Sequence, residues 1–337
     1  MRVLFIGGTG LISSACSAEA VRRGMEVTLL TRGLGAANYP PPAGVRRLTA
    51  DIRNDPAGAS RVLAGSAFDV VVDWVAYTLP HIETDLELFS GRTRQFVFIS
   101  SASAYQKPPV HFVYREDTPL ANPFWEYSRH KIACEERLVR AFRETGFPVT
   151  IVRPSHTYGP GKVPASLTAR GGYTHLARMR RGAPVIVHGD GTSLWTLTWN
   201  GDFARAFVGL LGHPQAIGQA VHITSDEALN WNQIHALVAQ ALGVEPRIVH
   251  IATDALCARH PEWIGPLWGD KAWCAVFDNS KIKRLVPDYI ATMPFAEGAR
   301  RAIAWFDERP ERRVVDEDAE RRWDALIAEH TAKARPS

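Results

Sequence analysis

The residues with the clearest potential for chemistry are a tyrosine and a lysine four positions apart, Tyr127 and Lys131. On a helix they share one face, so the lysine ammonium can lie below the phenol. A free tyrosine has a pKa of about 10, and ionising it near neutrality requires a shift of roughly 3 units, or about 4 kcal/mol. A nearby positive charge supplies part of that shift. The pair therefore predicts a base that takes the proton of a substrate hydroxyl.

A serine-rich segment offers this pair a partner. It runs Ile99-Ser-Ser-Ala-Ser-Ala-Tyr105, and we expect the Ser101 hydroxyl to hold the substrate oxygen. A Tyr-x-x-x-Lys spacing is common by chance on surface helices. Its interpretation as an active site therefore depends on the serine-rich segment and on a second motif at the N-terminus.

That second motif is a glycine-rich turn, Gly7-Gly8-Thr9-Gly10, between an apolar strand at residues 3–6 and a helix at residues 11–23. Glycines allow backbone amides at the helix N-terminus to approach a pyrophosphate, whose negative charge the helix dipole favours. The order strand, turn, helix predicts a nicotinamide dinucleotide site. The oxidised ring would help to ionise Tyr127, and Lys131 would also bind the cofactor ribose. Ser13 replaces the third glycine of the usual fingerprint, so a hydroxymethyl group must fit between helix and strand.

The end of the second strand bears on the choice of cofactor. NAD-specific sites usually place an acidic residue there, whereas this chain reads Leu30-Thr31-Arg32-Gly33. The Arg32 guanidinium can bind a 2′-phosphate through charge-assisted hydrogen bonds. We therefore expect NADP(H) to bind at least as tightly as NAD(H).

The composition is that of a globular protein, with 46% hydrophobic residues. No apolar run reaches membrane-spanning length and no cleavable signal pattern is present, so we expect a cytoplasmic protein without membrane contact. The four cysteines lack paired metal-ligand spacing, which predicts no metal site and reduced, mostly buried thiols. The formal net charge of +4 is small and spread over both halves, which disfavours nucleic acid as a partner.

Apolar segments and helical patterns alternate along the first half, as an α/β protein with a Rossmann-type, doubly wound parallel sheet requires. The expected strands are residues 27–30, 45–48, 70–73, 96–99 and 149–152, and the expected helices are residues 56–64, 80–89 and 125–144. We expect residues 1–165 to form mainly the NAD(P)-binding domain. Residues 166–330 should form mainly a smaller, discontinuous substrate-binding lobe, with some segments returning to the first domain. Its expected helices are residues 173–181, 202–211, 232–242 and 294–307, and the charged run at residues 309–322 should be a solvated helix without a specific partner.

With these motifs, the chain resembles the short-chain dehydrogenase/reductase superfamily, in its extended branch of NAD-dependent epimerases and dehydratases. The resemblance rests on the glycine turn, Asp51-Ile52-Arg53, Phe98 to Tyr105, Tyr127 with Lys131, Arg153-Pro154-Ser-His-Thr-Tyr158-Gly159-Pro160 and Gly189-Asp190-Gly191-Thr192. It implies a catalytic triad of Ser101, Tyr127 and Lys131, and it allows a homodimer. The cofactor contacts that it implies are Gly7, Thr9, Gly10, Leu11, Ile12, Asp51, Ile52, Ala76, Ser100 and Pro154, beside Arg32, Tyr127 and Lys131.

Departures from the family pattern narrow the function. Dehydratases of this branch follow the catalytic hydroxyl with an Asp-Glu pair, whereas this chain has Ala102 and Ser103, which argues against dehydration. Sugar-nucleotide epimerases commonly clamp the diphosphate with an asparagine and an arginine, at positions held here by His156 and Trp195. His156 could be an acid, a base or an oxygen ligand, or a packing residue. The candidate substrate contacts are Ser103, His156 and Trp195, and the arginines that could replace the clamp are Arg170, Arg178 and Arg181.

Tryptophans gather in the second half, and we expect most of them to pack in the core or the lobe. The run from His260 to Trp273 looks like an ordered loop near the mouth of the active site. An aromatic-lined pocket would suit a sugar ring, a nucleoside or a natural-product aglycone.

These observations predict an NAD(P)-dependent epimerase or oxidoreductase acting at a hydroxyl-bearing carbon of a sugar or sugar-nucleotide-like small molecule. The alternative is an NADPH-dependent ketoreductase or dehydrogenase on a sugar-like or natural-product substrate. A third hypothesis, from another class, is a noncatalytic RNA-binding protein, because the fold also resembles chloroplast stem-loop RNA-binding proteins. RNA binding is disfavoured because the triad is intact and no dense basic stripe is present.

Overall fold

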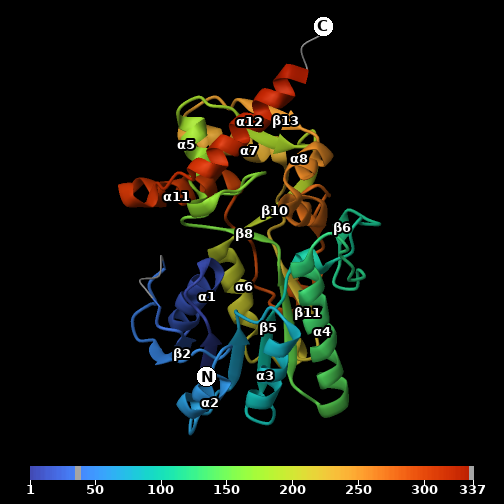
Figure 1. Cartoon of the computed structure of the whole chain (residues 1–337). Helices are drawn as coiled ribbons and strands as arrows, with labels where there is room; N and C mark the ends of the chain where they lie inside the picture. Colours follow the sequence, from blue (N-terminus) through green and yellow to red (C-terminus); the bar gives the residue numbers. More distant parts are fainter. Residues whose placement is uncertain (35–38, 334–337) are drawn as a thin grey trace.

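The computed structural model describes residues 1–34 and 39–333, and its core is a parallel sheet of seven strands (Figure 1). The strand order is β11-β7-β5-β4-β1-β2-β3. The strands are β1 (Arg2–Ile6), β2 (Glu26–Thr31), β3 (Arg46–Thr49), β4 (Val70–Asp73), β5 (Gln95–Ile99), β7 (Val149–Pro154) and β11 (Ala220–Ile223). The chain runs outward from β1 to β3, and then continues on the other side of β1 from β4. This reversal makes the carboxyl ends of β1 and β4 the place where a doubly wound sheet binds its ligand.

The sheet is covered on both faces, which explains its near-continuous apolar strands. On β1, Val3 and Phe5 belong to the core under one set of helices, while Leu4 and Ile6 belong to the core under the other. The first face is covered by α1 (Leu11–Arg22), α6 (Asn200–Leu210) and α10 (Ser280–Leu285), and the second by α2 (Pro56–Leu63), α3 (Leu79–Phe89) and α4 (Glu126–Thr145). The predicted fold class is therefore confirmed.

A second lobe lies above the carboxyl edge of the sheet (Figure 1). Its strands are β6 (Val113–Tyr114), β8 (His156–Tyr158), β9 (Val185–His188), β10 (Leu194–Trp199), β12 (Ala228–Asn230), β13 (Ile248–Ile251) and β14 (Val276–Phe277). Its helices are α5 (Thr174–Arg180), α7 (Trp231–Leu242), α8 (Thr253–Arg259), α9 (Ile264–Pro266), α11 (Phe295–Asp307) and α12 (Glu317–Lys333), with a π-helical turn at Leu267–Lys271. Strands β6, β8 and β10 connect this lobe to the sheet edge and carry several residues of the site.

The charged tail differs from its prediction. The run at residues 309–322 is not one solvated helix: a short turn at Pro310–Arg312 precedes α12, which begins at Glu317. Helix α12 buries Ala319, Trp323 and Leu326 in an apolar cluster, so it is packed against the lobe. The apolar residues of this helix lie at helical spacing between the charges, and the charge run obscured them in the sequence.

Three further predictions can be compared with the structure. All four cysteines are free thiols and three of them are buried, as expected. Most of the tryptophans are packed, with Trp195 and Trp231 among the largest fully buried side chains. Within residues 1–34 and 39–333, no helix has the length and apolar character that crossing a membrane requires.

Candidate functional site

Two cavities open at the carboxyl edge of the sheet. One, of about 770 Å³, runs past the glycine turn and the ends of β1, β2 and β4. The other, of about 730 Å³, lies between that edge and the second lobe and is lined by Ser101 and Tyr127. We consider the first as the candidate cofactor site and the second as the candidate substrate site.

The glycine turn fits the close approach of a dinucleotide. Gly7 and Gly8 have φ angles of +98° and +104°, which disfavour other residues. A Cβ on Gly8 would lie 2.6 Å from a methyl of Leu29, so the turn has no room for a side chain there. The N-terminus of α1 follows directly, with its positive dipole end toward the turn. Gly7 and Thr9 line the cavity, and their contacts with a cofactor stay predictions.

Ser13 fits between helix and strand without displacing them. Its hydroxyl accepts a hydrogen bond from the Gly10 N–H at 2.9 Å, and the side chain is buried. The hydroxymethyl group therefore caps the start of α1, and one backbone amide of the turn is already satisfied within the protein.

The opposite end of this cavity carries two exposed arginines and an aspartate whose carboxylate holds the turn that follows it. Arg32 and Arg47 both line it and both are exposed. The Asp51 carboxylate accepts hydrogen bonds from the Asn54 side chain at 2.8 Å and from two backbone amides, and these bonds lower its pKa. Ile52 is buried beside it and also lines the cavity. The structure thus brings Arg32, Asp51 and Ile52 to one cavity, and their contacts with a cofactor stay predictions.

A buried ion network holds the loop after β4. Arg53 pairs with both Asp73 and Asp85, whose side chains are fully buried. The second oxygen of Asp73 accepts hydrogen bonds from the N–H groups of Val75 and Ala76 at 2.7 and 2.9 Å. The network fixes the backbone at Ala76, where the sequence resemblance implies a cofactor contact. Asp73 has a lowered pKa because Arg53 and these amides favour its charge over the cost of burial.

Lys131 connects two strand ends to helix α4. Its ammonium donates hydrogen bonds of 2.7 Å to the carbonyl oxygens of Ala76 and Ile99. It also lies 5.8 Å from the centre of the Tyr127 ring, as the spacing of four residues predicts. Burial lowers the pKa of Lys131 to about 8. At neutral pH the group is therefore still mostly charged.

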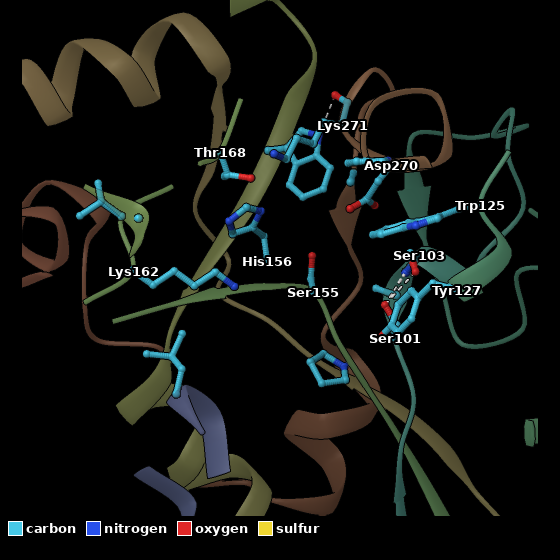
Figure 2. A pocket seen from close by; sticks show the side chains of 18 of the residues that line it. Ser101, Ser103, Trp125, Tyr127, Ser155, His156, Lys162, Thr168, Asp270 and Lys271 are labelled. Atoms are coloured by element: carbon cyan, nitrogen blue, oxygen red, sulfur yellow. Dashed lines mark hydrogen bonds between the residues drawn. The ribbon is translucent and has the colours of Figure 1, made fainter. Parts of the chain in front are cut away.

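Tyr127 and Ser101 face each other at one side of the substrate cavity (Figure 2). A hydrogen bond from Ser101 favours the ionised phenol, but burial has the larger effect and raises the pKa of Tyr127 to about 12. The negative charge of Asp270 acts in the same direction as burial. In the protein alone the phenol is therefore a proton donor at neutral pH, and the shift required for a base is larger than the one estimated from the sequence.

Ser101 belongs to a chain of hydroxyls. Its oxygen lies 2.9 Å from that of Ser103, which accepts a hydrogen bond from Ser128 at 2.8 Å. Asn122 donates to the Ser103 carbonyl oxygen and to that of Gly269, and so ties this segment to the second lobe. The chain of hydroxyls orients Ser101. Ser103 is held from three sides, so its predicted role as a substrate contact is less direct than that of Ser101.

His156 and Trp195 lie together in the cavity wall. The Trp195 indole N–H donates to backbone carbonyls of the loop at residues 260–273, and the His156 ring packs against the indole edge-on at 5.6 Å. Burial holds the pKa of His156 well below its ordinary value, so the imidazole is neutral. Its Nε2 is buried and has no hydrogen-bond partner among the described residues. Pro154 and Leu11 also line this cavity.

The arginines proposed to replace the diphosphate clamp lie elsewhere. Arg178 pairs with Asp324 at 2.5 Å and Arg181 with Glu320 at 2.5 Å, both on α12. Arg170 is exposed and does not line the cavity. Arg178 and Arg181 cannot replace the clamp, because they are paired with helix α12, whose packing against the lobe was not predicted from the sequence.

Several cavity residues were missed in the sequence: Lys107, Trp125, Lys162, Asp270 and Lys271. The π-helical turn at Leu267–Lys271 brings Asp270 and Lys271 to the cavity, within the loop that the sequence placed near the active-site mouth. Burial raises the pKa of Asp270 to about 6, against the opposing charges of Lys107 and Lys271. Lys162 follows the Gly159-Pro160 motif by two residues, and this short spacing was the one feature of the sequence that could have indicated its place in the cavity.

Comparisons with known proteins agree with this fold. The model of the NAD dependent epimerase/dehydratase family matches residues 3–224. The chain is 28% identical to 2'-dehydrokanamycin reductase of Streptomyces kanamyceticus over 289 residues, which are 86% of this chain and 80% of that protein. It is also 28% identical over 260 residues to the chloroplast stem-loop binding protein of 41 kDa b of Arabidopsis thaliana, covering 74% of this chain and 65% of that protein.

Solved structures share the fold. An epimerase of Methanothermobacter thermautotrophicus aligns with a TM-score of 0.76 at 20% identity, covering 92% of this chain and 93% of that chain. UDP-glucuronic acid 4-epimerase of Bacillus cereus, in complex with NAD, aligns with a TM-score of 0.72 at 19% identity, covering 91% and 99%. With the family match over most of the sheet domain, the chain belongs to the NAD dependent epimerase/dehydratase family of the extended short-chain dehydrogenase/reductase superfamily, and it is an enzyme of that type.

Proposed function

We propose that this enzyme transfers hydride at a hydroxyl-bearing carbon of a sugar or sugar-nucleotide-like substrate, with Ser101, Tyr127 and Lys131 as its triad. The observation that carries the proposal is the arrangement of the three groups. The Tyr127 phenol faces Ser101 in the substrate cavity, and the Lys131 ammonium lies 5.8 Å from the phenol ring on the side of the strand ends.

Each residue of the triad has one task. Tyr127 takes the proton from the substrate hydroxyl, and it returns a proton when the carbonyl is reduced. Ser101 holds the substrate oxygen by a hydrogen bond, and Ser103 orients Ser101 through the 2.9 Å contact. The Lys131 charge favours the tyrosinate. The nicotinamide dinucleotide supplies the hydride acceptor or donor when bound, and the glycine turn and the Asp51 end of the neighbouring cavity would hold it.

The lining of the substrate cavity supports a sugar-like substrate. Trp125 offers an aromatic face, and Ser101 and Ser155 offer hydroxyls in the same space, while the buried Trp195 forms part of the wall. Aromatic faces with a few placed hydrogen-bonding groups suit a polyhydroxylated ring. Relatives of this family named for UDP-sugar substrates support the same class.

Replacing Tyr127 by phenylalanine tests the triad. Tyr127→Phe deletes the acid–base oxygen and leaves the ring, so we expect turnover to fall by at least roughly 100-fold while the Kd for cofactor stays nearly unchanged. Turnover should be measured as product formed from candidate UDP-sugars and free sugars, and cofactor binding by fluorescence titration. A variant that kept more than about a tenth of the wild-type rate would refute the proton-transfer role.

Epimerisation is our first choice of reaction, and net reduction of a ketone is the second. The family match favours epimerisation, whereas the similarity to 2'-dehydrokanamycin reductase and the arginines at the cofactor cavity favour an NADPH-dependent reductase. The two differ in the fate of the hydride. With substoichiometric cofactor, an epimerase completes many turnovers with an unchanged nicotinamide spectrum. Conversion that stops at one product per added NADPH would establish the reductase instead.

We propose that the enzyme binds NADP(H) as readily as NAD(H), because Arg32 and Arg47 line the same cavity and provide positive charge for a 2′-phosphate.

The RNA-binding alternative keeps the support of one relative. A cytoplasmic homodimer remains an expectation from the sequence. Failure of every sugar and ketone substrate, together with retained binding to a stem-loop RNA, would favour the RNA-binding hypothesis.

A further inference from the structure

The substrate cavity contains more positive than negative side chains. Its lining includes Lys107, Lys162 and Lys271, and Asp270 is the one carboxylate in that lining within residues 1–34 and 39–333. Two of the lysines are engaged in the protein. Lys107 donates to the Tyr114 hydroxyl, and Lys271 donates to the carbonyl oxygens of Ala165 and Ser166.

Lys162 is different. No hydrogen bond or ion pair of its ammonium occurs in the described part of the chain, although its backbone is fixed by hydrogen bonds in both directions with Gly159. Figure 2 shows its side chain extending into the cavity beside Ser155 and His156, on the side away from Tyr127. The side chain is open to solvent through the cavity. Although the residue as a whole is exposed, protein atoms around the ammonium displace part of its hydration, and this burial lowers its pKa.

No neighbouring group described in this part of the cavity neutralises the positive charge of Lys162. Lys271 is close enough for the two positive charges to repel, and their repulsion lowers the pKa of Lys271 further. His156 is neutral, and both lysines contribute to keeping it so. Its buried Nε2 is a polar atom without a partner among the described residues. An ammonium and an imidazole without partners, in one corner of a cavity, suit an oxyanion that accepts hydrogen bonds from both.

We propose that Lys162, with His156 beside it, binds a carboxylate or phosphate group of the substrate and so selects an anionic substrate. The inference rests on the proposed function, because it places this group at the end of the substrate cavity opposite the triad. It also accounts for the loss of the usual clamp, since the arginines considered from the sequence do not line the cavity. Lys162 would provide the charge that those positions no longer supply.

The proposal can be tested by binding of small probes to the full-length enzyme saturated with NADP⁺ or NAD⁺, which blocks the neighbouring cavity. Calorimetry should compare D-glucuronate with D-glucose, and UDP with uridine. We expect at least one anionic probe to bind more tightly than its neutral counterpart. A preference for glucuronate alone identifies a carboxylate, and a preference for UDP alone identifies a phosphate.

Variants then assign the preference to Lys162. Lys162→Met should weaken the binding of the preferred anion roughly 10- to 100-fold, which is the range expected for the loss of a hydrogen bond to a charged group. It should leave the neutral counterpart unaffected. Lys162→Arg should keep most of the preference, and Lys283→Met, at an exposed lysine paired with Asp226, is the matched control. Thermal unfolding should show that Lys162→Met folds, because the Lys162 ammonium makes no hydrogen bond within residues 1–34 and 39–333 that the variant could lose.

The two proposals can fail separately. Absence of any anion preference in the wild type, or a preference that survives Lys162→Met, would overturn the role of Lys162. The same titrations on Tyr127→Phe should give unchanged probe affinities. If Tyr127→Phe also kept its turnover, the hydride-transfer proposal would fail while the anion site stood.

Discussion

Removing the charge of Lys131 should slow the oxidation of a substrate hydroxyl by a factor that depends on pH. A charge 5.8 Å from the phenol ring interacts with the tyrosinate by about 332/(20 × 5.8), or about 2.9 kcal/mol, at an effective dielectric constant of about 20. This corresponds to about 2 pKa units. The pKa of about 12 for Tyr127 belongs to the protein with Lys131 in place. Lys131→Met should raise that pKa further, by up to these 2 units, and below pH 8 the tyrosinate population should drop by up to about 100-fold.

The pKa of Lys131 determines how the ratio of wild-type to Lys131→Met rates changes with pH. Lys131 has a pKa lowered to about 8, so its charge is present below that pH and is lost above it. The advantage of the wild type over Lys131→Met should therefore shrink as pH rises, from about 100-fold near pH 7 to a few-fold near pH 9.5. A lysine with a role only in packing would give a constant ratio of rates.

The assay is a pH series of kcat for hydroxyl oxidation at saturating cofactor. Because Lys131→Met also leaves the carbonyls of Ala76 and Ile99 without their donor, we expect it to lose about 1–3 kcal/mol of stability. Only the temperature range in which circular dichroism shows a folded variant should be used. Lys131→Arg keeps the charge and should recover part of the rate at pH 7. A ratio of wild-type to Lys131→Met rates that stayed below about 5 at pH 7 would refute the electrostatic reasoning.

Three further changes test other parts of the site. Asp270→Asn removes a charge that raises the pKa of Tyr127, so the tyrosine-dependent limb of the pH profile should move to lower pH by up to about 1 unit. Because the pKa of Asp270 is raised to about 6, its ionisation opposes folding, and the unfolding temperature of wild type relative to this variant should fall as pH rises through 6. In fluorescence titrations, Arg32→Ala should weaken the binding of NADP(H) at least about 10-fold more than the binding of NAD(H). A strong preference for NAD(H) that Arg32→Ala leaves unchanged would contradict the role of Arg32 in binding a 2′-phosphate. Arg53→Met should cost about 3–5 kcal/mol in denaturant unfolding at pH 7, because the buried Asp73 carboxylate loses its cation, whereas burial and the Asp73 charge hold the pKa of Asp85 well above its ordinary value. A cost below about 1 kcal/mol would show that Asp73 is protonated as well.

The sheet domain could be predicted because local patterns determine it. Short apolar runs with a strand period, each followed by a helical pattern, allow few arrangements other than a doubly wound sheet. The strand expected at residues 70–73 coincides with β4, and the helix expected at residues 80–89 differs from α3 by one residue. The Tyr-Lys spacing likewise fixed the relation of the two side chains, because both lie on one helix, α4.

The second lobe could be predicted only in outline because long-range contacts build it. Strand β8 pairs with β10, forty residues later, and Trp195 forms an isolated bridge with Ala275. No local pattern specifies such pairings. Lys162 and Asp270 line one cavity, and the local patterns around them were too weak to single out these two side chains.

The electrostatics of the site could not be read from spacing either. From the sequence, we expected the charge of Lys131 to supply part of the decrease in the pKa of Tyr127. In the structure, burial affects both groups and makes each charge costly, so the phenol is harder to ionise and the ammonium is easier to discharge. Because burial disfavours both charges, the tyrosinate is more stable while Lys131 holds its proton. The triad therefore acts as one coupled unit, and the basic limb of its pH profile belongs to the pair rather than to Tyr127 alone.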